Sequence, residues 1–474
     1  MVLPLCGARA RLGHACFSLK AGQTPKADYA GGWLRFGASP HQQARFVPVP
    51  PPAIDAAQPR GDLSPRLMDQ AYLPKSVLYA TSARIGGVGL DAVALETLRG
   101  LKDQLGLAIA YGLRTSPTGD HPSDADAWLR QRHLVKNLSW HPVRLLSNLQ
   151  SRYYYAAKKR AVDSVAAKYL RTGRFDLFHG WSGEALQSLQ VAKSLGIPTL
   201  LEVPTWHRQK GKTLPPKTEQ ELAMENVPVP QRWLNRLLIS RQESLLEYET
   251  ADLLLVLSAK AAETFTVLGT PKEKLYPISR GVDVNRFIPG PKPSIFRAVF
   301  VGALIKRKGV HWLIEAWRRL KLPSAELWLA GHPHTEIQPF LKNLPENVKL
   351  LGFTKDIVKV YQACSLHIFP SECEGSAKST YEAAACGLPQ ITTRESGDVV
   401  VDGENGLLVP PNNVEALVTA ITKLYENPKL REELGQRGRE RVVQHFTWDH
   451  FRERLQGAYR TALELKSKEF TAAN

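Results

Sequence analysis

The sequence predicts an α/β protein with two doubly wound domains, each built on a parallel sheet whose two faces are covered by helices. Three observations lead to this fold class. The chain has 474 residues, too many for one ordinary core, because single domains hold about 100 to 200 residues. Apolar residues make up 43% and charged residues 23% of the chain, as in globular proteins with a sizeable core. Short apolar runs alternate with amphipathic stretches, which is the pattern of strands joined by helices in a parallel sheet.

The first 70 residues or so do not share this pattern. They are rich in Pro, Gly, Ala and Arg and lack hydrophobic periodicity, so residues 1–70 are predicted to be a disordered extension. An Arg-rich, acid-poor segment is typical of a transit peptide, and an over-extended start codon explains it equally well. The sequence shows neither the apolar region of a secretory signal nor an apolar run long enough to cross a membrane. We therefore expect a cytoplasmic protein.

The first alternating series begins at Ser76 and predicts an N-terminal domain over residues 71–288. Residues 77–80 are predicted as a strand, 86–89 as a tight glycine loop and 92–105 as an amphipathic helix, which together form a βα unit. The further predicted strands are 108–111, 177–179, 199–203 and 253–257, and a further helix is predicted over 184–195.

A segment with three prolines, residues 286–294, marks a linker. It leads to a predicted C-terminal domain over residues 289–445, followed by a C-terminal helix and tail over 446–474. The helix is predicted from about Trp448 to Lys466 and is expected to cross back to the N-terminal domain. Within the C-terminal domain the predicted strands are 298–302, 326–330, 349–351 and 366–369, and the predicted helices are 310–320, 356–363 and 414–425.

Cysteine usage and net charge limit the function classes. The five cysteines, Cys6, Cys16, Cys364, Cys373 and Cys386, form no CxxC pair, which argues against a disulfide framework and against a zinc site. The net charge of +17 predicts a polyanionic partner: nucleic acid, an anionic membrane surface or a substrate that bears phosphate.

Two carboxylates, Glu374 and Glu382, lie eight residues apart in the stretch ECEGSAKSTYE. Within one helix they would be about 12 Å apart, whereas glycosidase acid/base pairs need about 5 to 9.5 Å. If Glu374 lies in the loop after strand 366–369 and the helix starts near Ser376, the pair flanks a helix N-terminus, which favours a diphosphate. The two carboxylates would then bind hydroxyls at the two ends of a nucleotide sugar. The structural alternative is a capping box in which Ser379 caps the helix, which leaves Glu374 unexplained.

A second motif, FVGALIKRKG at residues 300–309, combines a strand that ends in glycine with a short basic loop and a following helix. Lys306, Arg307 and Lys308 at the carboxyl end of a strand suit a leaving diphosphate, because cations offset its developing charge. The alternative for any one of them is a solvated surface cation. The place of Lys308 just before the helix favours it as a ligand.

These motifs resemble those of a known family. The run FPSECEGSAKSTYEAAACGLPQITT, followed by DGENGLLVPPNN, resembles the donor-binding signature of the family 4 (group 1) retaining glycosyltransferases, which have the GT-B fold. IGGVG, FDLFH and RGVDVNRF resemble, in the family's order, its N-terminal glycine loop, its acceptor-domain strand and the segment that enters its linker, and residues 300–309 are similar to its phosphate loop. The resemblance covers about residues 76–460 and implies that the N-terminal domain binds the acceptor and the C-terminal domain the nucleotide sugar.

The resemblance also implies a role for each site residue. Glu374 would contact the donor sugar, Glu382 the ribose hydroxyls and Lys308 the diphosphate. Where the family usually has an arginine, after the glycine of the phosphate loop, this chain has Ala303, and we expect Arg307 to supply the missing cation. The other predicted site residues are Gly302, Gly375, Ser376 and Ala377 on the donor side, where amides near Ser376 and Ala377 would hold sugar or phosphate oxygens, and Gly87 and Gly89 in the loop for acceptor and diphosphate.

A histidine is also expected to reach the reacting sugar. His207 follows strand 199–203 near the family's position for this histidine, although Pro204, Thr205 and Trp206 shift the local pattern. His179 is the second candidate, but a lone histidine at the end of a strand is more often structural. We therefore place His207 in the predicted site.

Residues 129–174 form a strongly basic run in which Asp163 is the only acid and Tyr153 to Tyr155 interrupt the cations. Such a run suits an anionic membrane surface, and lipid-linked acceptors are common in the resembling family. The run contains no recognised nucleic-acid-binding module, which argues against a nucleic-acid surface. The structural alternative is a helical face that is simply exposed to solvent. The basic residues are Arg130, Arg132, Lys136, Arg144, Arg152, Lys158, Lys159, Arg160, Lys168, Arg171 and Arg174.

The resemblance thus predicts a retaining glycosyltransferase that moves a hexose from a nucleoside diphosphate sugar, such as a UDP- or GDP-sugar, to a hydroxyl of a glycan, a lipid-linked saccharide or a small molecule. The resemblance implies front-face displacement with no metal and no other cofactor. Two alternatives remain at this stage. One is a glycan phosphorylase of the same fold, whose pyridoxal-phosphate lysine is not identifiable, and the other is a non-enzymatic polyanion-binding protein.

Overall fold

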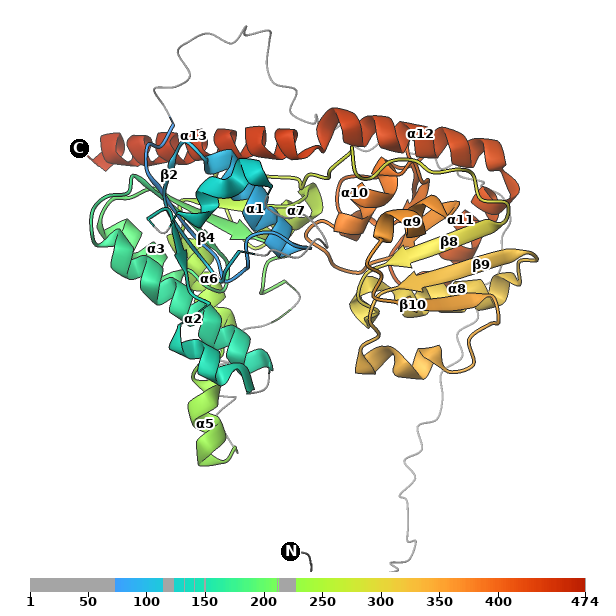
Figure 1. Cartoon of the computed structure of the whole chain (residues 1–474), viewed down its shortest axis with the longest axis horizontal. Coiled ribbons are helices and arrows are strands. Elements are labelled where there is room, and N and C mark those ends of the chain that lie inside the picture. Colours follow the sequence, from blue (N-terminus) through green and yellow to red (C-terminus); the bar gives the residue numbers. More distant parts are fainter. Residues whose placement is uncertain are drawn as a thin grey trace, which may run out of the picture. The chain divides into compact units, whose positions relative to one another are not determined.

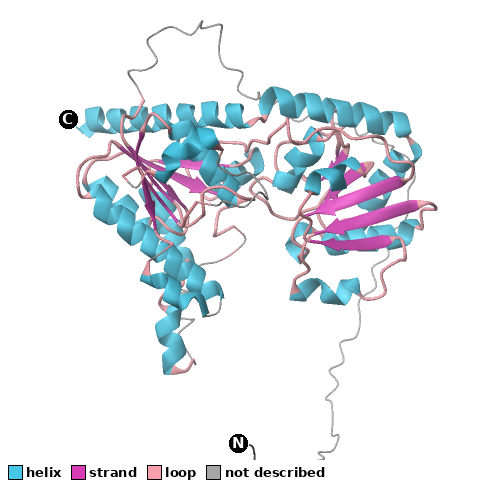
Figure 2. Ribbon diagram, in the orientation of Figure 1, coloured by secondary structure: helices cyan, strands magenta, loops and turns pink. Residues whose placement is uncertain are grey.

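The computed structural model describes residues 73–113, 123–131, 133–139, 141–148, 151–210, 212 and 227–473 of the chain. All of them belong to one compact unit, Pro65–Asn474. Two separate parallel sheets, each flanked by helices, make up the architecture (Figure 1; Figure 2). The predicted fold class is therefore confirmed. The extension predicted over residues 1–70 lies outside the described residues.

The first sheet has seven parallel strands among the described residues, in the order β3-β2-β1-β4-β5-β6-β7. The chain builds outward from β1 on one side and then, from β4, on the other side. The carboxyl ends of β1 and β4 therefore flank the switch point where ligands of such sheets usually bind. The strands are β1 Val77–Ala80, β2 Leu105–Ala110, β3 Val135–Asn137, β4 Leu177–Trp181, β5 Thr199–Val203, β6 Leu253–Val256 and β7 Leu275–Pro277.

Helices cover both faces of this sheet because alternate strand residues point to opposite sides. Leu78 and Ala80 of β1 pack with apolar residues of α2, α3, α6 and α7, whereas Val77 and Tyr79 pack with α1 and with the C-terminal helix. The helices are α1 Leu90–Leu101, α2 Ser151–Leu170, α3 Leu186–Ser194, α5 Val229–Asn235, α6 Arg241–Thr250 and α7 Ala259–Thr266.

The predicted end of the first helix was wrong. α1 ends at Leu101 rather than at Leu105, because Leu105 already pairs with Val77 at the start of β2. The polar residues in between form a turn in which the Gln104 amide donates to the Leu101 carbonyl at 2.7 Å. An apolar residue at helical spacing can belong to the next strand, which is why periodicity alone placed this boundary incorrectly.

The second sheet has six parallel strands in the described residues, in the order β10-β9-β8-β11-β12-β13. β11 and α8 begin and end where the sequence predicted them. The strands are β8 Phe296–Val301, β9 Ala325–Ala330, β10 Val348–Gly352, β11 Leu366–Phe369, β12 Gln390–Thr392 and β13 Leu407–Leu408. The helices are α8 Val310–Leu320, α9 Ile357–Gln362, α10 Lys378–Ala385, α11 Val414–Glu426 and α12 Pro428–His445.

The last helix, α13 Trp448–Ala473, crosses back to the first sheet as predicted. Its buried residues Trp448, Phe451 and Leu455 belong to the same apolar cluster as Val77 and Leu253 of the first sheet. The helix therefore covers the first sheet although it follows the second sheet in the sequence (Figure 1).

A buried ion pair ties these elements together. Arg280 Nη1 donates to Glu202 Oε1 of β5 at 2.5 Å, and both side chains are at most 6% exposed. Burial raises the pKa of Glu202, but the interactions with Arg280 and His179 together hold this pKa below its ordinary value. His179 Nε2 lies 3.7 Å from Glu202, and its Nδ1 lies 2.9 Å from the Tyr459 hydroxyl of α13. His179 is fully buried in this network, which agrees with a structural role.

A second buried carboxylate holds the turn between β4 and α3. Glu247 of α6 accepts hydrogen bonds from the amides of Gly183 and Ala185 at 2.5 and 2.9 Å and from the Ser182 hydroxyl at 3.2 Å. Burial raises the pKa of Glu247 to about 7. The turn therefore depends on a carboxyl group that titrates near neutral pH.

Replacing Arg280 by methionine should lower the free energy of unfolding by about 3 to 5 kcal/mol, because Glu202 would stay buried without its counter-charge. The matched control is Lys292→Met, which removes the ion pair between Lys292 and Glu432, whose side chains are 79% and 57% exposed. That change should cost less than about 1 kcal/mol. Urea unfolding followed by circular dichroism measures both, and equal costs for the two variants would contradict the assigned role of Arg280.

Glu247 should make the stability fall as pH rises. Its pKa of about 7 in the folded protein exceeds the ordinary 4.5 of an unfolded chain, so the folded state binds the proton more tightly. The stabilisation is complete below pH 4.5 and is lost as pH rises through 7. Between about pH 5 and pH 8 the loss is on the order of 2 kcal/mol.

Glu247→Gln should remove this component, so the unfolding free energy of the variant should fall less between these two pH values than that of the parent protein. The control is Glu249→Gln, which changes an exposed carboxyl on the same helix. Denaturant unfolding at both pH values measures the difference. Parallel pH profiles for the parent protein and Glu247→Gln would show that the carboxyl does not titrate as described.

Candidate active site

The loop between β11 and α10 carries the first of the two predicted glutamates. Glu374 lies in this loop, where its amide donates to the Glu395 carbonyl at 2.9 Å. Gly375 follows it, and a Cβ at this position would overlap the carbonyl oxygen of Pro204. Glycine is therefore required here, because the donor loop closely approaches the loop that follows β5.

Two cations from the loop after β8 face Glu374. Arg307 Nη1 and Lys308 Nζ lie 3.3 and 3.6 Å from Glu374 Oε1. This oxygen is buried and accepts no hydrogen bond from the described residues. The Arg307 guanidinium also donates to the carbonyl of Cys373. The site thus contains a positively charged pair next to a carboxylate oxygen that still has capacity to accept a hydrogen bond.

Two glycines shape the loop that carries these cations. Gly309 has φ +69°, and a Cβ there would overlap the carbonyl oxygen of Pro370, so the turn before α8 lies directly against the end of β11. Gly302 has φ +150°, and a Cβ there would lie 3.2 Å from Lys308 Nζ. The strand β8 therefore ends in a conformation that leaves room for the Lys308 amine.

The helix α10 begins at Lys378, two residues later than predicted, and its N-cap is Ala377, which offers no capping side chain. The alternative of a capping box at Ser379 is therefore wrong, because Ser379 lies inside the first helical turn. Loop atoms replace a cap: the Ala377 amide donates to the Ser396 carbonyl at 2.8 Å. Of the two amides predicted to bind donor oxygens, that of Ala377 is thus engaged within the protein.

Glu382 lies within α10, so the two glutamates flank the start of this helix. It is 9% exposed, its Oε2 accepts a hydrogen bond from the Tyr361 hydroxyl at 3.1 Å, and its Oε1 lies 3.5 Å from Lys378 Nζ. Burial, followed by the nearby Glu382 carboxylate, raises the pKa of Tyr361, so the phenol stays protonated and able to donate. The Glu382 carboxylate is thus fixed in direction.

Ser376 is held between two neighbours. Its hydroxyl lies 2.6 Å from the Tyr381 hydroxyl, and a Cβ on Gly397, where φ is +117°, would lie 2.7 Å from Ser376 Oγ. The loop of residues 393–397 therefore packs closely behind Ser376 and fixes its position.

His207 lies in the loop after β5, three residues beyond the Pro204 carbonyl that contacts Gly375. Its ring packs edge-on against Phe265, with centroids 4.8 Å apart, and its Nδ1 accepts a hydrogen bond from the Gln209 amide at 3.1 Å. Burial lowers the pKa of His207, so the ring is neutral near pH 7 and carries its proton on Nε2. The histidine and Glu374 thus stand on two loops that touch each other.

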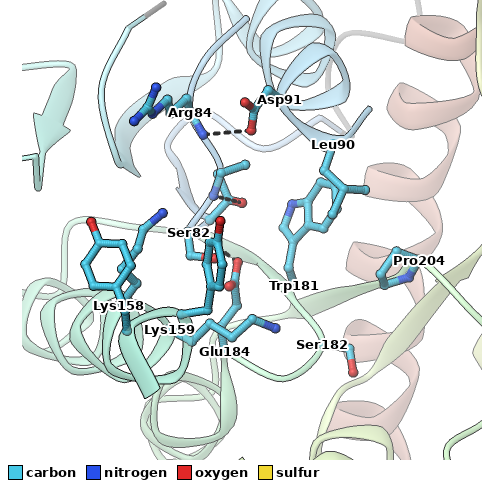
Figure 3. Close-up of a pocket in the computed structure, with 14 residues that line it drawn as sticks. Ser82, Arg84, Leu90, Asp91, Lys158, Lys159, Trp181, Ser182, Glu184 and Pro204 are labelled. Carbon is cyan, nitrogen blue, oxygen red and sulfur yellow. Dashed lines mark hydrogen bonds between the residues drawn. The ribbon is translucent and has the colours of Figure 1, made fainter. Parts of the chain in front are cut away.

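A pocket of about 500 Å³ opens beside the carboxyl ends of β1 and β4 (Figure 3). Sequence reasoning predicted the glycine loop near it, where Gly87 and Gly89 have φ of +135° and +62° just before α1, but not the pocket itself. Residues from the loop after β1, from α1, α2 and β4, and from the loops after β4 and β5 meet here, and no motif links these segments in the sequence. The lining residues are Thr81, Ser82, Ala83, Arg84, Leu90, Asp91, Tyr154, Tyr155, Lys158, Lys159, Trp181, Ser182, Glu184 and Pro204.

Two further features bear on the class of protein. Within the part of the chain that the structure describes, no three His, Cys, Asp or Glu side chains gather in a way that could hold a metal ion. Among the described helices, none combines the length and the apolar character that crossing a membrane requires.

Comparison with known sequences identifies one segment in the C-terminal part of the chain. The sequence model of the family Glycosyl transferases group 1 matches residues 296–427. The D-inositol 3-phosphate glycosyltransferase of Kribbella flavida is 28% identical over 415 residues, which cover 80% of this chain and 92% of that protein. The capsular polysaccharide biosynthesis glycosyltransferase CapM of Staphylococcus aureus is 33% identical over 175 residues, or 35% of this chain. This second match spans 46% of CapM, so the chain covers about half the length of this relative.

Comparison with solved structures supports the same fold for the described domains. Sucrose-phosphate synthase from Thermosynechococcus elongatus aligns with a TM-score of 0.59 at 20% identity, over 84% of this chain and all of that one. Anabaena HepE in complex with UDP aligns with a TM-score of 0.57 at 19% identity, over 80% of this chain and 98% of that one. Residues 296–427 therefore match a group 1 glycosyl transferase domain, and the described domains have the GT-B fold of these solved structures.

Proposed function

We propose that the protein is a retaining glycosyltransferase that transfers a hexose from a nucleoside diphosphate sugar to an acceptor hydroxyl. The observation that carries this proposal is the arrangement of Glu374, Arg307 and Lys308 beside the start of α10, inside the group 1 glycosyl transferase domain. The solved complexes of Anabaena HepE with UDP and with UDP-glucose support a nucleotide sugar as the donor.

Charge stabilisation would do most of the catalytic work. Arg307 and Lys308 would contact the diphosphate and offset the negative charge that grows as the glycosidic bond breaks. The start of α10 would add the positive end of its helix dipole, with the Ser376 amide directed at the donor. The departing diphosphate can take the proton of the acceptor hydroxyl, so no carboxylate has to act as the general base.

Positioning of the sugar would come from three side chains. Glu374 Oε1 has unused hydrogen-bonding capacity, which suits a hydroxyl of the donor hexose. Glu382, oriented by Tyr361, would hold the ribose hydroxyls. His207 would donate from Nε2 to the reacting sugar, since its Nδ1 already accepts from Gln209. Fixed contacts of this kind lower the barrier by holding the reactants in line.

The acceptor would bind to the N-terminal domain. Relatives include enzymes named for capsular polysaccharide and for lipopolysaccharide core biosynthesis, which supports a saccharide acceptor. A peripheral contact of the basic run with an anionic membrane surface is part of the same proposal. Arg152, Lys168, Arg171 and Arg174 are exposed, as such a contact requires.

A panel of UDP-, GDP- and ADP-hexoses should contain at least one donor that raises the thermal unfolding midpoint, because a ligand that binds the native state stabilises it. With that donor, Glu374→Gln should lower turnover about 100-fold or more, because a contact to the reacting sugar is lost. Glu372→Gln, in the same loop, is the matched control. Turnover by Glu374→Gln at the parent rate, or a panel in which no donor binds, would refute the proposal.

Arg307→Ala should weaken the binding of the nucleoside diphosphate about 10- to 100-fold, since it removes a charge-assisted contact. The control is Lys306→Ala in the same loop, because Lys306 Nζ lies over the Phe340 ring, 5.3 Å from its centroid, instead of facing Glu374. Isothermal titration with the diphosphate of the best donor measures both variants. Undiminished affinity in Arg307→Ala would show that this residue does not replace the arginine absent at Ala303.

A further inference from the structure

We propose that the pocket beside β1 and β4 selects an acceptor that carries a phosphate group, which Arg84, Lys158 and Lys159 bind while the aromatic residues contact the sugar ring (Figure 3). The assignment of this pocket to the acceptor rests on the proposed transferase function. Its charge selectivity rests on the residues that line it.

The three cations of the pocket form no direct ion pair among the described residues, although Glu184 interacts electrostatically with Lys158 and Lys159. In the described part of the chain, no carboxylate oxygen lies within 4.0 Å of a side-chain nitrogen of Arg84, Lys158 or Lys159. The Lys158 amine instead lies over aromatic rings, 4.4 Å from the centroid of Tyr111 and 5.6 Å from that of Tyr155. Since a half-buried lysine without a direct ion-pair partner is costly, an anionic ligand would stabilise Lys158 and Lys159.

The environment of Lys158 also favours an anionic ligand. Burial lowers the pKa of Lys158, and the positive charge of Arg84 lowers it further, whereas Glu184 and Asp91 act in the opposite direction. Two like charges on different elements, Arg84 after β1 and Lys158 on α2, thus face one pocket. A ligand with two negative charges would offset the cost of burying the lysine charge and the repulsion between the two cations.

The two carboxylates of the pocket are engaged with backbone. Glu184 Oε1 accepts a hydrogen bond from the Ser82 amide at 2.8 Å, and Asp91 Oδ1 accepts one from the Arg84 amide at 3.1 Å. Both acids therefore shape the loop after β1. Three cations remain against these two carboxylates, so the pocket has an excess of positive charge.

The size of the pocket, its lining residues and its position suit a phosphorylated sugar. A volume of about 500 Å³ lies in the range of small-molecule sites. Tyr154 and Tyr155 offer ring faces and hydroxyl groups to a sugar. Trp181 contributes an apolar wall, because its Nε1 already donates to the Tyr79 hydroxyl at 3.0 Å. Pro204 lines the pocket and also touches Gly375, the neighbour of Glu374, so an acceptor held here lies next to the donor loop.

Phosphate fits better than carboxylate because two of the three cations are lysines. A lysine acts as a point charge and has no planar fork to match a carboxylate, whereas a phosphate monoester carries about −1.5 to −2 charges at pH 7 and three acceptor oxygens. The group that the pocket recognises on the acceptor is therefore a doubly charged tetrahedral phosphate.

Isothermal titration with matched probes tests this inference. The probes are glucose 6-phosphate, glucuronate and glucose, together with myo-inositol 1-phosphate and myo-inositol. A phosphorylated probe should bind at least about tenfold more tightly than its neutral partner. The double variant Lys158→Gln/Lys159→Gln should lose that preference and leave the affinity for the donor unchanged. The control Lys168→Gln, an exposed lysine on the same helix, should keep it.

Three results would overturn the inference. They are the absence of binding by both phosphorylated probes, equal affinity for a phosphorylated probe and its neutral partner, and an unaltered preference in the double variant. Glucuronate that binds as tightly as glucose 6-phosphate would overturn the choice of phosphate. Donor binding and turnover are measured separately, so a protein that uses a nucleotide sugar but shows no phosphate preference contradicts this inference alone. A protein that prefers phosphates but binds no donor contradicts the transferase instead.

Discussion

The ion pair between Arg280 and Glu202 is the interaction on which the rest of the molecule depends, because it lies where the chain leaves the first sheet. Immediately after Arg280, the Val282 amide donates to the Phe446 carbonyl at 2.9 Å. The outgoing segment thus runs against the returning one. A Cβ on Gly281 would lie 2.6 Å from the Trp448 ring, so only glycine permits this approach. The residues that directly follow the buried Arg280 therefore contact the returning segment.

The same segment links the two candidate sites. On the donor side, the backbone of Arg280 lies close to the Tyr381 hydroxyl, which is 2.6 Å from the hydroxyl of Ser376. On the acceptor side, the Arg280 guanidinium lies 5.7 Å from the centroid of the Trp181 ring, and Trp181 lines the pocket. A shift of Arg280 would thus disturb Ser376 and Trp181 together. Burying the Arg280 charge costs free energy. In return, Arg280 fixes the positions of residues in both candidate sites.

Sequence reasoning could predict the fold because its signals are local. β5 and β11 are short, fully buried runs of four or five residues, and their predicted bounds match the structure. Elements without such a signal were missed, including β13, which has only two residues. The donor loops were predictable because Glu374, Gly375 and Glu382 lie in one continuous stretch. The start of α10 was not, since Ser396, a residue from another loop, replaces the expected side-chain cap.

The pocket could not be predicted because its cations are far apart in the sequence. Arg84 and Lys158 come together only because β1 pairs with β4, which places the loop after β1 beneath α2. Read along the chain, Lys158, Lys159 and Arg160 form one basic triplet, yet Arg160 pairs with Glu243 at 2.9 Å while the two lysines line the pocket. The positive charge of this run is thus divided between an internal ion pair, a ligand pocket and an exposed face. The anionic partner expected from the net charge stays a prediction. A membrane surface would use the exposed cations and a phosphorylated acceptor the two pocket lysines, so the net charge alone does not distinguish these partners.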